Sequence, residues 1–409
     1  MGTNAIAARR HGWIAQDAPY WALALTCIAA QAFKLHCGAY WIGGEQYTTG
    51  CYSDAVPFWG LRGVAAGQVP YFGARMEYPV LTGAMIWIEG LVAGVLGLGH
   101  PDAADFLTAV WLGNAALAFV VLWMMRRAGV DLARQYAWAL APPLVLYLGH
   151  NWDMLAVTFA VSALLAARAG HDVRATALAA LGGAAKLFPV LMLPLLGLGA
   201  LVRGGIARGA LLVVVAVAAW GAVNLPVAAL AFTNWSEFYT FSSQRSGTAA
   251  SIWELATQFG WFPTDIATRN TLALLLFAGG AAGIVAIGWR RHRDRLWLLF
   301  MPVLAWFLLT NKVWSPQFDL WLWPVIVLFG TRPRAMALFL LGDLAAYFAE
   351  FWLFAGMEGA HPSATQIDVA TAAAVRAVAL FWLIWGALRD AAPAWIADQA
   401  PAGARPVAA

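Results

Sequence analysis

The sequence predicts an all-α protein that crosses a membrane many times. Of its 409 residues, 62% are hydrophobic and 11% are charged, and the mean hydropathy is +0.68. Soluble domains carry about 25% charged residues. Apolar runs of about 20 residues, long enough to cross a hydrocarbon core, recur from end to end. We therefore expect a single integral membrane domain over residues 1–409.

Arginine clusters separate many of these apolar runs. Basic loops stay in the cytoplasm, so every second loop, together with both termini, is predicted to be cytoplasmic. The net charge of +4 reflects this distribution and does not indicate a nucleic-acid partner. The clusters are Arg126, Arg127 and Arg134; Arg168 and Arg174; Arg203 and Arg208; Arg290, Arg291, Arg293 and Arg295; and Arg332 and Arg334.

About twelve spans satisfy this alternation. The N-terminus resembles a signal peptide, but no small-residue cleavage site follows it, so the first span is predicted to be uncleaved. Residues 79–98 are also apolar, yet a span there would turn the arginines outward. We interpret them as an interfacial or half-inserted helix on the outer face, with thirteen spans as the alternative. The predicted spans are 18–36, 104–125, 132–149, 152–168, 174–186, 187–202, 207–230, 269–289, 295–311, 317–331, 334–354 and 369–389.

Two loops are long, and both are predicted to lie outside, at 37–103 and 231–268. Loops of this length are more often functional than accidental, although membrane-interface residues explain most of the aromatic side chains in the second. Cys37 and Cys51 could pair in the first loop. The chain has no CxxC and no Cys/His set with zinc spacing, so no metal site is predicted.

Asp54 is the first candidate for chemistry. It follows the first span in the polar, aromatic segment 51–59. A carboxylate at the membrane surface can act as a base on a lipid-linked substrate. The simpler alternative is that Asp54 is an ordinary loop carboxylate that caps the helix that follows. Asp153, His150, Tyr78 and other polar groups are predicted on the same outer face.

Cations are predicted beside Asp54. Lys186, Lys312 and Arg245 all fall on the outer side, while most arginines fall on the other. Ionisable groups near membrane depth are costly and usually functional, although snorkelling or end capping explains any one of them alone. Lysine is a compact charge suited to phosphate. The full set of substrate-binding candidates is Lys312, Lys186, Arg245, Gln244, Asp153, His150, Tyr78, Gln317 and Trp314.

These parts suit glycosyl transfer from a polyprenyl phosphate. A base removes the proton of the acceptor hydroxyl, and a cation stabilises the leaving phosphate. The sequence contains no P-loop and no Gly-rich nucleotide fingerprint, which argues against a nucleotide-sugar donor. No cofactor is predicted.

Short segments over about residues 50–325 carry a resemblance to a known family. The chain resembles GT-C class membrane glycosyltransferases, and most of all glycosyltransferase family 87, which contains polyprenol-phosphate-mannose-dependent mannosyltransferases. Glu77-Tyr78-Pro79-Val80 departs from the pattern, because many relatives have a second proline there. The matching segments are Tyr52-Ser53-Asp54, Tyr78-Pro79, Trp152-Asp153, Lys186-Leu187-Phe188-Pro189, Gln244-Arg245, Ser251-Ile252-Trp253 and Trp314-Ser315-Pro316-Gln317-Phe318.

The resemblance implies a GT-C-like bundle of about twelve transmembrane helices, with interfacial helices in the first outer loop. It implies that Asp54 is the general base of an inverting transfer and that Lys312, Lys186 and Arg245 are candidates to bind the donor phosphate. The expected donor is a polyprenyl-phosphate sugar, with mannose favoured over arabinofuranose. The expected acceptor is a lipid-linked or envelope glycan at the outer face of the plasma membrane.

Two other classes of function stay open. A transporter or flippase of a lipid-linked sugar would place charges midway in broken helices and often shows internal repeats. We find no repeat, and the candidate charges are predicted at one face. The third class, a scaffold or binding membrane protein, does not explain the cations on the outer face.

Overall fold

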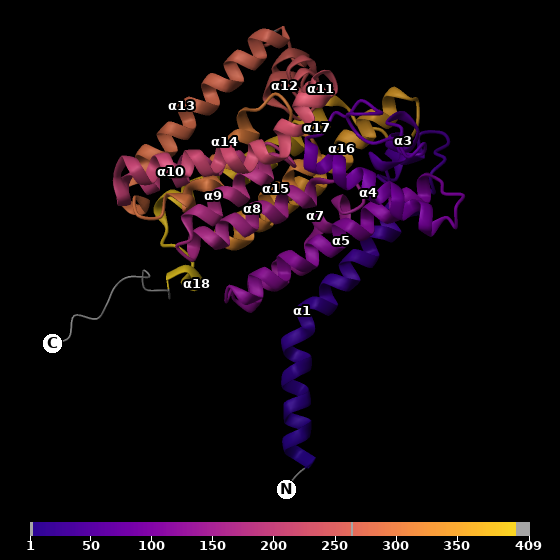
Figure 1. Cartoon of the computed structure of the whole chain (residues 1–409). Helices are drawn as coiled ribbons and strands as arrows, with labels where there is room; N and C mark the ends of the chain where they lie inside the picture. Colours follow the sequence, from indigo (N-terminus) through magenta and orange to yellow (C-terminus); the bar gives the residue numbers. More distant parts are fainter. Residues whose placement is uncertain (1–2, 263–264, 398–409) are drawn as a thin grey trace, which may run out of the picture.

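The computed structural model describes residues 3–262 and 265–397, and Figure 1 shows a bundle of helices. Within these ranges there is no β-strand. The α-helices are α1 (Thr3–Leu35), α2 (Glu45–Thr48), α3 (Ala55–Leu61), α4 (Val80–Leu96), α5 (Ala103–Arg127), α6 (Leu132–Ala139), α7 (Pro142–Tyr147), α8 (Asp153–Arg168), α9 (Asp172–Gly183), α10 (Leu193–Leu230), α11 (Phe232–Gln244), α12 (Ile252–Gln258), α13 (Ile266–His292), α14 (Phe300–Thr310), α15 (Asp319–Phe329), α16 (Pro333–Met357), α17 (Gln366–Arg389) and α18 (Ala394–Ala397).

The predicted class, an all-α membrane protein, is confirmed. In the described part of the chain, 5 helical segments are long and apolar enough to cross a membrane. The number of twelve spans stays a prediction, because several of the other predicted spans are shorter or interrupted helices. The 5 segments are Ala103–Arg127, Phe188–Leu230, Ile266–His292, Pro333–Met357 and Gln366–Arg389.

Proline explains one departure from the predicted spans, and glycine explains a break that falls where the prediction has it, between 202 and 207. The predicted span 132–149 is divided into α6 and α7, because Pro142 and Pro143 begin a new helix instead of continuing the first. The predicted spans 187–202 and 207–230 lie within η1 (Phe188–Met192) and α10, which kinks at Gly205. Gly205 has φ 71°, a left-handed conformation that only glycine adopts readily.

The two long loops predicted to lie outside meet at one end of the bundle. Both contain helices, α2 to α4 in the first and α11 and α12 in the second. Arg75 forms an ion pair with Glu237 at 2.5 Å, and the Asn234 side chain donates to the Tyr71 carbonyl at 2.6 Å. The loops therefore share one surface, as the predicted alternation requires.

The arginine-bearing loops meet one another at a different end. Arg134 donates to the Gly330 carbonyl at 2.9 Å, and Arg203 donates to the Asp294 carbonyl at 2.8 Å. Arg332 pairs with Asp390 at 2.8 Å. Figure 1 shows α3, α11 and α12 well away from α18, which follows Asp390. Arg405, in the C-terminal tail, lies outside the described residues.

The apolar segment 79–98 forms α4, a helix of 17 residues. At about 1.5 Å per residue it is roughly 26 Å long, shorter than a hydrocarbon core of about 30 Å. Its Glu89 is buried and accepts a hydrogen bond from Trp152 Nε1 at 2.6 Å, while Leu91 and Val95 are exposed. One face packs on the protein and the other is apolar. An exposed apolar face is compatible with the predicted half-inserted helix, whose depth in the membrane stays a prediction.

Cysteine labelling tests which side of the membrane each end faces. We expect an Ala66→Cys variant to react with an impermeant maleimide added to intact cells, because Ala66 is exposed in the first long loop. An Ala133→Cys variant, exposed beside the Arg134 cluster, should react only after permeabilisation. The native Cys27 is buried and supplies the unlabelled background. Labelling of position 133 from outside would refute the predicted orientation.

Candidate functional site

Asp54 lies at the start of α3 but does not cap it. Its side chain makes no hydrogen bond to the first turn of the helix. The backbone N–H of Asp54 donates to the His150 carbonyl at 2.8 Å, which joins the loop to the region between α7 and α8. Its carboxylate instead accepts a hydrogen bond from the Tyr78 hydroxyl, at 3.2 Å from Oδ2. The capping alternative for Asp54 therefore has no support in the geometry.

The surroundings of Asp54 make its carboxylate a stronger base than usual. Burial raises the pKa of Asp54 to about 6, although a hydrogen bond from Tyr52 and the charge of Lys186 act in the opposite direction. Burial disfavours the charged form of an acid. A carboxylate with this pKa is ionised near neutral pH and can accept a proton more readily than an exposed aspartate.

Lys186 lies beside the Asp54–Tyr78 pair. Its Nζ is 4.7 Å from the centre of the Tyr78 ring. It forms an ion pair with Asp153, at 2.7 Å from Oδ1, and Trp321 Nε1 donates to the other Asp153 oxygen at 2.7 Å. Both oxygens of Asp153 are thus engaged, and its side chain is fully buried. Asp153 is suited to holding Lys186 in place and poorly suited to act as a second base.

Lys34 is a site residue that the sequence analysis did not single out. Its buried ammonium donates to the carbonyls of Gly50 at 3.2 Å and Tyr52 at 2.8 Å, close to Asp54 in sequence. It also lies 3.3 Å from His150 Nδ1. The His150 carbonyl accepts a hydrogen bond from the Asp54 amide. Lys34 therefore contacts both the chain just before Asp54 and the residue to which the Asp54 backbone is bonded. His150 is itself buried and supports this segment.

Lys312 and Arg245 lie together at the second long loop. Lys312 Nζ donates to the carbonyls of Ser243 at 3.0 Å and Arg245 at 2.8 Å. Burial lowers the pKa of Lys312, and the charges of Arg245 and Arg269 lower it further. Among the described residues, neither Lys312 nor Arg245 forms an ion pair with a carboxylate, whereas Arg269 pairs with Glu254 at 2.8 Å.

Arg245 connects this cationic group to Asp54. Burial lowers the pKa of Arg245, and the nearby groups Tyr78, Asp54 and Glu77 partly offset this effect. Arg245 is therefore within electrostatic reach of the Asp54–Tyr78 pair. The structure brings Asp54, Tyr78, Lys186 and Arg245 into one neighbourhood, with Lys312 anchoring the loop behind Arg245. Lys186 is paired with Asp153, whereas Arg245 and Lys312 have no carboxylate partner among the described residues, and such cations favour an anionic ligand.

The remaining predicted residues differ in their placement. Gln244 is exposed at the end of α11, and Gln317 is partly buried in η3 (Pro316–Phe318). Trp314 is buried and donates through Nε1 to Asp319 Oδ1 at 3.0 Å. The contacts of Trp314 belong to the packing of the bundle, so its predicted role in substrate binding has no support in them.

A buried network under Trp314 was also missed by the sequence analysis. Arg376 pairs with Asp319 at 2.9 Å, and both side chains are fully buried. The Arg376 guanidinium lies 4.1 Å from the centre of the Trp314 ring. Glu350, also buried, accepts from the Ala250 amide at 3.2 Å, in the loop that follows Arg245. The Arg376–Asp319 pair thus joins α17 to α15, and Glu350 joins α16 to the second long loop.

No protein-family model and no curated protein matches this sequence. Among solved structures, the fold is similar to the crystal structure of the Archaeoglobus fulgidus oligosaccharyltransferase in the apo form, with a TM-score of 0.42 and 14% sequence identity. The similarity covers 92% of this chain and 56% of the oligosaccharyltransferase chain. This chain therefore corresponds to little more than half of that protein's length.

Proposed function

We propose that this chain is an inverting membrane glycosyltransferase of the GT-C class. In this proposal it moves a sugar, with mannose favoured, from a polyprenyl-phosphate donor to a hydroxyl of a lipid-linked or envelope glycan. The reaction takes place at the outer face of the plasma membrane. The observation that carries the proposal is the uncapped Asp54 carboxylate, bonded to Tyr78 and close to Lys186 and Arg245.

Each group has a role in the proposed transfer. Asp54 accepts the proton of the acceptor hydroxyl as its oxygen attacks the anomeric carbon. The bond from that carbon to the phosphate oxygen breaks, and the polyprenyl phosphate leaves with the electron pair. Lys186 and Arg245 balance the charge on the leaving phosphate. Attack opposite the leaving group inverts the configuration. Aromatic side chains such as Tyr78 exclude water and pack against the sugar.

A transfer assay tests the proposal directly. The purified protein in liposomes is given labelled polyprenyl-phosphate mannose, or other polyprenyl-phosphate sugars, together with a glycolipid acceptor. A new glycosidic bond supports the enzyme. Movement of the donor across the bilayer without bond formation would favour the alternative, a flippase. Neither product nor movement with any donor would leave the proposal without support.

The pKa of Asp54 predicts how turnover depends on pH. A base works in its deprotonated form, so kcat/KM should be constant above pH about 6 and fall roughly tenfold per pH unit below it. Lys186 lowers the pKa of Asp54, so Lys186→Met should move this limb of the profile to higher pH. Lys186→Arg, which keeps the charge, should leave the limb near its original position. An acid limb that stays in place in the Lys186→Met variant would contradict the assignment.

Loss of Arg245 should weaken use of the donor. Charged hydrogen bonds contribute about 1.5–3 kcal/mol, so Arg245→Ala should lower kcat/KM for the donor by roughly 10–150-fold. Arg75→Ala is a matched control, because Arg75 is exposed in the neighbouring loop and pairs with Glu237. Equal losses in the two variants would assign Arg245 to the structure of the loop and not to the phosphate.

A further inference from the structure

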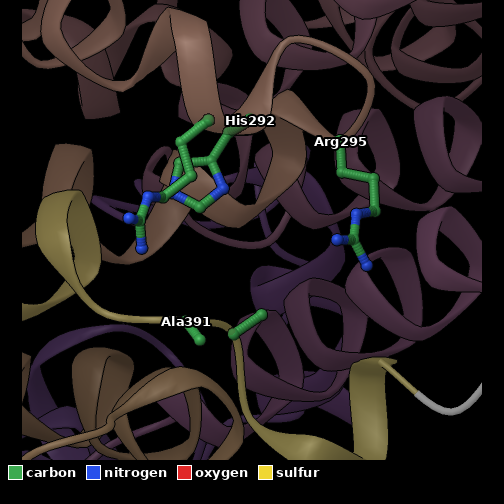
Figure 2. Close-up of a pocket in the computed structure, with 5 residues that line it drawn as sticks. His292, Arg295 and Ala391 are labelled. Atoms are coloured by element: carbon green, nitrogen blue, oxygen red, sulfur yellow. The ribbon is translucent and has the colours of Figure 1, made fainter.

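A cavity of about 310 Å³ lies far from Asp54, at the end of the bundle where the arginine-bearing loops meet. Figure 2 shows it between the end of α13, which carries His292, and the segment that follows α17, which carries Ala391. A bound water needs only about 10–15 Å³ of such volume. The cavity can hold a group much larger than water. Its lining residues are Arg291, His292, Arg295, Ala391 and Ala392.

All the titratable side chains that line this cavity are basic. Among the described residues, Arg291 and Arg295 form no ion pair with a carboxylate. Asp390 lies next to the cavity in sequence, but it already accepts hydrogen bonds from Arg332 at 2.8 and 2.9 Å and from Thr331 at 2.8 Å. The charge of Arg291 helps to lower the pKa of Asp390, but in the described part of the chain no carboxylate contacts Arg291 or Arg295 directly.

The His292 side chain, which lines the cavity, is held in one orientation by a hydrogen bond. The side chain is buried, and Nε2 lies 3.0 Å from the Ala387 carbonyl. A carbonyl only accepts, so Nε2 carries the hydrogen of this bond and Nδ1 is left for another partner. An adjoining small cavity shares His292 and is lined by the apolar side chains of Leu298, Phe329 and Pro393 and by the polar side chains of Thr331 and Asp390. The basic site thus borders a lining that is partly apolar and partly polar.

Basic residues at a helix end have a simpler explanation. Cations complement the dipole at a helix C-terminus, and arginines gather in cytoplasmic loops. This explanation applies equally to Arg290 and Arg293, which lie in the same turn but do not line the cavity. It does not explain a cavity with two arginines, a buried histidine and no acid in its lining.

We propose that this cavity binds a phosphate group, with Arg291 and Arg295 donating to its oxygens. Arginine binds phosphate through paired, charge-assisted hydrogen bonds. The phosphate can belong to the headgroup of an anionic phospholipid or to free phosphate. Basic pockets between transmembrane helices are known to bind lipid headgroups, and Leu298, Phe329 and Pro393 beside the cavity supply apolar contacts that free phosphate would not use. The site is separate from the proposed transfer reaction.

The test measures thermal stabilisation of the full-length protein in detergent. Dihexanoyl-phosphatidylglycerol, dihexanoyl-phosphatidylcholine and inorganic phosphate are titrated separately at constant ionic strength. A ligand that binds only the folded state raises the melting temperature with its concentration. We expect phosphatidylglycerol to do so and phosphatidylcholine not to. Stabilisation by inorganic phosphate alone would keep the phosphate site and identify free phosphate as its ligand.

Matched variants separate the cavity from general surface charge. Arg291→Gln with Arg295→Gln should weaken the apparent affinity by more than about tenfold. Arg290→Gln with Arg293→Gln makes the same change in charge outside the cavity and should leave the affinity unchanged. Ala392→Leu narrows the cavity without changing the charge and should also weaken binding. Melting curves without ligand show whether each variant is folded.

Three results would overturn the proposal: no stabilisation by either anion, equal losses in the two arginine double variants, or full binding in a folded Ala392→Leu variant. The assay contains no sugar donor. Its failure therefore leaves the proposed role of Asp54 untouched, and inactive Asp54 variants leave this site untouched.

Discussion

Asp54→Asn should reduce sugar transfer by roughly 10²–10⁴-fold, the usual contribution of a positioned general base. Asparagine has nearly the shape of aspartate and can still accept the hydrogen bond from Tyr78, but it does not take a proton at neutral pH. Folding and donor binding should therefore be largely preserved. Transfer of a labelled sugar from its polyprenyl phosphate in liposomes measures the loss, and donor binding is measured separately.

Glu77→Gln provides the matched control. Glu77 is another carboxylate of the first long loop, and it pairs with Arg62 at 2.6 Å. The same change of acid to amide at this position should have a much smaller effect on turnover. Near-normal transfer by the Asp54→Asn variant would remove Asp54 from the mechanism. Asp153 is already bonded to Lys186 and Trp321, so it would not be ready to replace Asp54.

Arg376→Met should destabilise the folded protein by about 3–5 kcal/mol, the usual cost of breaking a buried ion pair by removing one partner. The substitution leaves Asp319 buried without its compensating charge. The free energy of unfolding in detergent measures this effect. Transfer activity is measured at a temperature at which the variant is still folded.

Two further variants isolate the cause. Arg126→Met removes an arginine from the exposed pair with Asp17 and should cost no more than about 1 kcal/mol. Arg376→Met combined with Asp319→Asn removes both charges and should recover part of the lost stability. Similar losses for Arg376→Met and Arg126→Met would show that burial does not make the Arg376–Asp319 pair important.

The sequence best predicted those features of the fold and the site that short stretches of neighbouring residues carry. The spacing of the arginine clusters predicted which loops meet, and the contacts of Arg134 and Arg203 agree with that grouping. The polar segment at Asp54 and the motif at Lys186 predicted two groups that the structure brings beside Tyr78. Pro142 and Pro143 are also typical of a helix start, but they lie within a continuous apolar run. We therefore predicted one span over 132–149 where the structure has α6 and α7.

Partners far apart in the chain were beyond sequence reasoning. Lys34 and Tyr347 are 313 residues apart, and their hydrogen bond depends on how α1 packs against α16. Arg376 and Asp319 belong to different helices, and neither has a motif around it that identifies the other. A lone charge in an apolar run indicates only that a partner is needed. The packing of the helices decides which residue supplies it.

The disulfide between Cys37 and Cys51 gives the segment around Asp54 a chemical dependence of its own. Cys51 lies close to Asp54 in sequence, so this covalent bond limits the freedom of the chain leading to the carboxylate. Disulfides persist in oxidising compartments and are rare where thiols are kept reduced. Formation of the site therefore depends on the redox state of the compartment that contains the first long loop, because that state decides whether the disulfide forms. A chain inserted in the opposite orientation would expose this loop to the reducing cytosol and would not keep the bond.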